Sequence, residues 1–147
     1  MANQGPITDA EVWDFAADWY RKLDVHVPVE QILPGLADAE LEMRFPEATE
    51  RGHDGFKHWY ERVIRIFFDE VHTLKEARIV EDGRQPRCKV LVNWQARVWN
   101  PPEPKSKWLG FDADQTWVVR RSPHNGQLQV VTYIVDELRP MEGSASL

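Results

Sequence analysis

The residue of this sequence best suited to proton transfer is His72, because the imidazole ring titrates near neutral pH. It lies in the run 68–74, early in a long strand-like pattern, and a histidine on a pocket wall can act as a general acid or base. The alternative is a strand histidine that only hydrogen-bonds to a neighbour. Asp136, near the end of the last strand-like pattern, is either an acid at the mouth of such a pocket or an ordinary acid at a sheet edge.

Aromatic side chains are the second chemical signal, with seven Trp, six Phe and three Tyr in the chain. Several lie in separate predicted elements and are expected to meet in one hollow, where they bind a flat apolar ligand by contact area and stacking. The other interpretation is that they fill the core. The predicted walls of the hollow are Trp19, Trp59, Trp94, Trp117 and Tyr133, with Val131 on the Tyr133 face of the last strand.

Other kinds of site find no support in the sequence. The single Cys88 excludes an internal disulfide and any metal site built from several cysteines, and we expect it to be a small buried residue. His53 and His58 are five residues apart, whereas two metal ligands on a helix favour four, so we predict no metal. The chain has neither a glycine-rich phosphate loop nor a Gly-x-Ser-x-Gly elbow, and we predict no cofactor.

The charge balance and the apolar runs bound the partners. The net charge of −6 argues against a nucleic-acid partner, because phosphate binding needs a clustered basic face. No apolar run approaches the roughly 18 residues that span a bilayer. The start, Met1 to Pro6, lacks a basic segment followed by an apolar one, so we expect a cytoplasmic protein without a membrane partner.

Periodicity and turn signals predict the elements that must position these residues. Thr8 to Glu11 forms a capping-box pattern at the start of the first helix. The expected elements are a helix over 9–23, a short helix over 29–33, a strand over 39–45, a polar loop over 46–51, a helix over 55–67, and strands over about 68–81, 88–99, 112–121 and 127–138. With a loose tail from Met141, the single domain of 1–147 has an ordered core over about 8–140.

The last predicted strand is apolar on both faces. Val130 and Ile134 lie on one face, and Val131 and Tyr133 lie on the other. A second apolar face left open on a monomer would form a large exposed patch, so we expect a homodimer.

Four motifs follow one another in a specific order: Asp38 to Glu42, then Arg51 to Tyr60 with its Gly-x-x-Gly-Phe, then Asp82-Gly83, then Asn125 to Leu128. Together they resemble the nuclear transport factor 2-like superfamily, and most of all its SnoaL-like polyketide cyclases and steroid delta-isomerases. The resemblance covers about 8–140. It implies an α+β fold in which a cone-shaped, curved, mixed or antiparallel sheet wraps around three N-terminal helices. It also implies a deep apolar pocket for a small apolar or aromatic ligand, and dimers through the convex sheet face.

The resemblance also implies places for catalytic groups. In the isomerase branch a carboxylate base stands nine residues before the Gly that opens the third-helix segment, and the place that corresponds here, counted back from Gly52, is Met43. A thioether cannot carry a proton, so Met43 is expected only on the pocket wall. The branch also uses a Tyr of the first helix to stabilise an oxyanion. That place falls near Trp19, and Tyr20 is one residue further.

A second acid of that branch lies on the penultimate strand, where Asp112, Asp114 and Gln115 compete and Asp114 is preferred. Two functions are compatible with these residues. The first is a cofactor-free isomerase, cyclase or dehydratase of an apolar cyclic carbonyl compound, which moves protons with His72 and with Asp114 or Asp136, helped by Tyr20. The second is a non-catalytic ligand-binding or dimeric interaction module, which the thioether at the expected base position favours.

Overall fold

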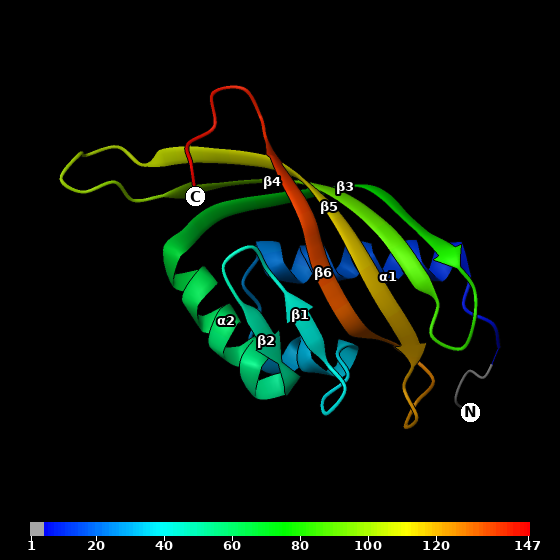
Figure 1. The fold of residues 1–147 in the computed structure, drawn as a ribbon. Coiled ribbons are helices and arrows are strands. Elements are labelled where there is room, and N and C mark those ends of the chain that lie inside the picture. Colours follow the sequence, from blue (N-terminus) through cyan, green and yellow to red (C-terminus); the bar gives the residue numbers. More distant parts are fainter. Residues whose placement is uncertain (1–4) are drawn as a thin grey trace.

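The computed structural model describes residues 5–147. These residues form one curved sheet with helices on its concave side (Figure 1). The helices and turns are α1 (Asp9–Asp24), two 3-10 turns (Val29–Gln31 and Leu33–Gly35) and α2 (Gly52–Ile66). The strands are β1 (Glu42–Arg44), β2 (Thr49–Arg51), β3 (Phe67–Glu81), β4 (Arg87–Val98), β5 (Lys107–Arg121) and β6 (Leu128–Pro140).

The sheet is mixed, which is one of the two forms predicted for the α+β fold. Its order is β2-β1-β6-β5-β4-β3, with β1 and β6 parallel and the remaining neighbours antiparallel. The long strands β3 to β6 arch over α1, while α2 and the short hairpin β1–β2 lie at the open end (Figure 1). This arrangement confirms the curved sheet around N-terminal helices.

Helix α1 begins where the capping pattern predicts. The backbone amide of Glu11 donates to the Thr8 hydroxyl over 3.2 Å, which satisfies one of the free donors of the first turn. The helix buries Val12, Ala16 and Leu23 against the sheet, so its apolar stripe faces the core.

The segment between the helices differs from prediction. The strand expected over 39–45 shrinks to β1, and β2 forms inside the expected polar loop because Glu50 pairs with Met43. Helix α2 starts at Gly52, three residues earlier than expected, because Asp38 accepts a hydrogen bond from the His53 amide over 2.9 Å. The short helix expected over 29–33 is divided into the two 3-10 turns.

The C-terminal tail, which the sequence analysis expects to be loose, makes hydrogen bonds to the sheet. Its backbone continues along β5: the Met141 amide donates to the Gly110 carbonyl over 2.8 Å, and the Ala145 amide donates to the Trp108 carbonyl over 3.0 Å. The Ser144 hydroxyl also accepts a bond from the Gly110 amide over 2.9 Å. These bonds return the tail to the open end of the sheet, where Leu147 lies beside the cavity described below.

Candidate functional site

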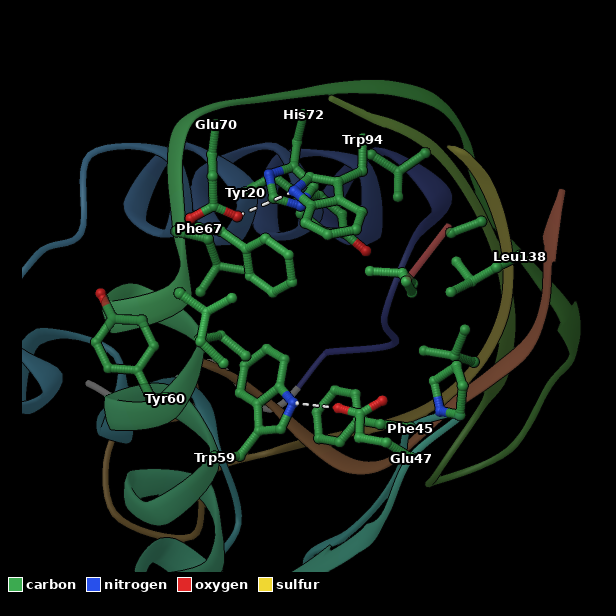
Figure 2. Close-up of a pocket in the computed structure, with 18 of the residues that line it drawn as sticks. Tyr20, Phe45, Glu47, Trp59, Tyr60, Phe67, Glu70, His72, Trp94 and Leu138 are labelled. Atoms are coloured by element: carbon green, nitrogen blue, oxygen red, sulfur yellow. Dashed lines mark hydrogen bonds between the residues drawn. The ribbon is translucent and has the colours of Figure 1, made fainter. Parts of the chain in front are cut away.

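A cavity of about 310 Å³ lies between the concave face of the sheet, the C-terminal half of α2 and the end of α1 (Figure 2). Its walls are mainly apolar and aromatic, and its size is at the lower end of the range for small-molecule sites. Polar atoms make up only a small part of the cavity surface, although ten of the lining residues carry a polar group. They are Tyr20, Glu47, Trp59, Tyr60, Arg62, Glu70, His72, Trp94, Gln115 and Tyr133.

His72 lines this cavity and is oriented by Asp24, the last residue of α1. The ring nitrogen Nδ1 lies 2.6 Å from Asp24 Oδ1, and the backbone amide of His72 donates to the same carboxylate over 3.0 Å. Because an ionised carboxylate only accepts hydrogen bonds, this contact assigns the proton to Nδ1. Nε2 is then the nitrogen left for a ligand. The His72 side chain is only 9% exposed.

Tyr20 extends this group across the cavity. Its ring stacks on the imidazole of His72 with centroids 4.7 Å apart. The Gln115 amide donates to the Tyr20 hydroxyl over 2.8 Å, and the Tyr133 hydroxyl lies 3.4 Å from it. Burial raises the pKa of Tyr20 well above its ordinary value and that of Tyr133 to about 12, so both hydroxyls keep their protons at neutral pH.

A second acid–histidine pair lies beside the first. Glu70 and His72 are two residues apart on β3, and both lie along the same side of the cavity (Figure 2). One Glu70 oxygen accepts the indole N–H of Trp94 over 2.9 Å, and the other makes a very short contact with His26 Nε2. Two acid–histidine contacts therefore join the end of α1 to the start of β3. In the first, the acid comes from α1 and the histidine from β3, and in the second the histidine comes from the α1 side and the acid from β3.

The mouth of the cavity is framed by an aromatic pair and an ion pair. The rings of Phe45 and Trp59 stack with centroids 4.1 Å apart and planes within 3°. Glu47 accepts the Trp59 indole N–H over 3.2 Å and pairs with Arg62 over 3.4 Å. The cation among the lining residues is thus already neutralised by the rim acid.

The cavity collects five of the residues that the sequence analysis assigned to the site: Tyr20, Trp59, His72, Trp94 and Tyr133. Four others are buried in the core instead of lining the cavity, namely Trp19, Met43, Trp117 and Val131. For these four, the interpretation that they fill the core describes their place.

Asp114 and Asp136 lie on the opposite, convex face of the sheet. Asp114 pairs with Arg139, and Asp136 accepts the Thr116 hydroxyl over 2.7 Å. Gln115, the next residue of β5, lies on the concave face, where it is buried and lines the cavity. The assignment of these two aspartates as pocket acids is therefore corrected: strand alternation and the bulge at Asp136 direct them away from the cavity.

Sequence reasoning missed Asp24, His26 and Glu70. A signal for them is present, because the pattern acid-x-His occurs both at Asp24 to His26 and at Glu70 to His72. The two copies are far apart in the chain, and nothing local indicates that they face each other. Among residues 5–147, no group of three or more His, Cys, Asp and Glu residues is arranged to hold a metal ion.

The comparisons with known proteins concern the fold. No protein-family model matches the sequence, and no curated protein is significantly similar to it. A hexachlorocyclohexane dehydrochlorinase, LinA type 2, has a similar structure, with a TM-score of 0.73 at 12% identity over 94% of this chain and 91% of that one. A ketosteroid isomerase-like protein from Erwinia carotovora atroseptica matches with a TM-score of 0.67 at 15% identity over 91% and 96% of the two chains.

A nuclear transport factor 2-like superfamily protein from Salmonella enterica matches with a TM-score of 0.62 at 15% identity, over 94% of this chain and 92% of that one. The chain therefore has the nuclear transport factor 2-like, cystatin-like fold. This fold hosts several activities, so the activity must be argued from the cavity and not from the fold. Within residues 5–147, no helix is both long and apolar enough to cross a membrane.

Proposed function

We propose that this protein is a cofactor-independent enzyme of the isomerase, cyclase or dehydratase type that moves protons on an apolar cyclic carbonyl compound. The observation that carries this proposal is the contact of 2.6 Å between His72 and Asp24 on the wall of an apolar cavity. A histidine whose Nδ1–H is held by a carboxylate presents a basic Nε2 to the ligand, and the carboxylate stabilises the imidazolium that forms.

The proposed step is the removal of a proton next to the ligand carbonyl. The C–H bond breaks and its proton goes to His72 Nε2, while its electron pair moves toward the carbonyl and leaves negative charge on the oxygen. The Trp117 indole donates to Gln115 over 3.0 Å, and Gln115 in turn donates to the Tyr20 hydroxyl. This order leaves the Tyr20 proton to be donated to Tyr133 or to a ligand oxygen, which is the role that a developing enolate requires.

The test is carbon–hydrogen exchange on a ketone probe. We expect the protein to accelerate deuterium incorporation next to the carbonyl of 1-indanone in D₂O, followed by proton NMR. His72→Ala is expected to slow the exchange by about a hundredfold, the usual contribution of a positioned base. Asp24→Asn is expected to slow it as well and to shift the His72 ring from the Nδ1–H to the Nε2–H tautomer, read from the ring ¹⁵N shifts.

The matched control is His58→Gln, since His58 lies on α2 with a largely exposed ring. It should leave both exchange and tautomer unchanged. If wild type and His72→Ala exchange the probe at the same rate while the cavity still binds it, the base assignment fails. The non-catalytic ligand-binding module is then the better description of this chain.

A further inference from the structure

Glu70 is a carboxylate that the proposed proton transfer does not use. It lines the apolar cavity, and its side chain is only 8% exposed. One oxygen takes the Trp94 indole N–H and the other contacts His26, so each oxygen keeps a lone pair for a further donor. A buried carboxylate of this kind is costly unless something in its surroundings compensates the charge.

The backbone is strained at both partners of the Glu70–His26 contact. A bulge in β3 between Phe68 and Val71 leaves Asp69 and Glu70 outside the regular register. Asp69 has φ of 51° and His26 has φ of 53°, a left-handed conformation that costs a residue with a side chain about 1–2 kcal/mol. Such strain is kept where the surrounding structure imposes it, and it gathers at functional sites. Here it accompanies the placement of Glu70 beside the cavity.

Apart from His26, the cationic groups around the cavity are paired with acids other than Glu70. Arg62 pairs with Glu47 at the rim, and His72 is held by Asp24. The ionic partner of Glu70 is His26, which, when neutral, donates its Nε2–H and leaves the carboxylate charged. The pKa of Tyr60 is raised to about 12, first by burial and second by its nearness to Glu70.

The aromatic rings next to Glu70 suit a cation. Trp94 binds the carboxylate through its indole N–H, and Phe67 meets the Trp94 ring edge-on with centroids 4.9 Å apart. Aromatic faces attract ammonium groups, and a charge-assisted hydrogen bond in an apolar cavity is about twice as strong as a neutral one. A carboxylate that lines an aromatic, apolar cavity therefore recognises a protonated amine better than a neutral hydroxyl.

We propose that Glu70 anchors a protonated amine, so that the cavity selects small, ring-containing apolar cations over neutral ligands of the same shape. This inference deepens the proposed function, on which it rests, by naming the substrate class: cyclic carbonyl compounds that carry an ammonium group. The ammonium would bind at Glu70, and the carbonyl side of the ring would face His72, two residues further along β3.

The test compares three ligands with one skeleton: 2-aminoindane, which is protonated at neutral pH, 2-indanol and indane. We expect wild type to bind the amine at least about tenfold more tightly than the alcohol, measured by calorimetry at pH 7.5. Glu70→Gln is expected to abolish this preference while keeping the affinity for 2-indanol. Glu76→Gln is the matched control, because Glu76 lies on the same strand as Glu70 but outside the cavity lining, where it pairs with Arg78.

A second variant, Glu70→Met, replaces the carboxylate with an apolar side chain of similar length and should bind indane more tightly than the amine. Its NMR spectrum shows whether the variant is folded. The proposal is overturned if wild type binds 2-indanol or indane as tightly as the amine, or if the preference for the amine survives in Glu70→Gln. Tight binding of the neutral probes in that case leaves the proposed function intact. If none of the three probes binds, the cavity is not a ligand site and both proposals fall.

Discussion

His72 and Glu70 show how two neighbouring side chains on one strand receive different roles from their partners. Asp24 holds His72 through two donors, which fixes the ring and its tautomer. His26 and Trp94 hold Glu70 through its two oxygens, which preserves a carboxylate inside an apolar wall. The first pair suits proton transfer and the second suits charge recognition, although both consist of one acid and one histidine.

The raised pKa of Tyr133 predicts how the free energy of unfolding changes at high pH. Its folded pKa is raised to about 12, so the folded protein keeps a proton that the unfolded chain releases at about pH 10. The stability linked to this proton is complete below pH 10 and declines as pH rises toward 12, by about 1.4 kcal/mol for each pH unit. Tyr133→Phe removes this decline, so we expect its free energy of unfolding in urea to fall by about 1 kcal/mol less than wild type between pH 9 and 11. Equal declines in the two proteins would contradict the prediction.

At the scale of elements, the start of α2 positions the part of this helix that lines the cavity. Gly52 has φ of 66°, and a Cβ added there would lie 3.3 Å from Asp38 Oδ1, the atom that accepts the His53 amide. The left-handed conformation at Gly52 turns the chain from β2 directly into the helix that carries Trp59 and Tyr60 into the cavity.

We therefore expect Gly52→Ala to lower the free energy of unfolding by about 1–2 kcal/mol, the cost of a left-handed residue with a Cβ. Gly52→Asn is the matched control, because Asn tolerates this conformation better and should fall between Gly and Ala. Urea denaturation of the three proteins gives the order. An alanine variant as stable as wild type would show that the turn into α2 relaxes without cost.

The boundaries of these elements were predictable to different degrees. Helix α1 and the long strands follow from capping, periodicity and turn residues, which are local properties, except that β5 begins at Lys107, five residues before its predicted start. β2 was missed because its three residues are polar and become a strand only by pairing with β1. The hydrogen bonds of the tail to β5 could not be predicted for a similar reason, since its Gly and Ser residues form no local pattern.

For the whole molecule, the convex face of the sheet remains the proposed dimer surface. Ile134 is paired with Thr116 on β5, and the Thr116 hydroxyl donates to Asp136 on the convex face. Ile134 and Val118 are only half-buried in the single chain. An apolar centre rimmed by ion pairs such as Asp114 with Arg139 is typical of an interface between two copies.

We expect sedimentation analysis to show a dimer and Ile134→Lys to shift it to monomer, because a buried charge without a partner opposes association. Val25→Lys is the control, since Val25 is exposed at the end of α1, the helix on the concave side of the sheet. A wild-type protein that sediments as a monomer at high concentration would remove the dimer proposal without affecting the cavity.

The sequence by itself determined the order of the two long helices and the four long strands, the fold that this order resembles, and the alternation that separates Asp114 from Gln115 on β5. Periodicity and turn chemistry act over a few residues, so they can be found along the chain. Only the tertiary structure decided which face of β5 is concave and thus put Gln115, not Asp114, in the cavity. It also brought Asp24 to His72 across 48 positions, because such contacts depend on how a helix packs on a sheet and leave no local pattern.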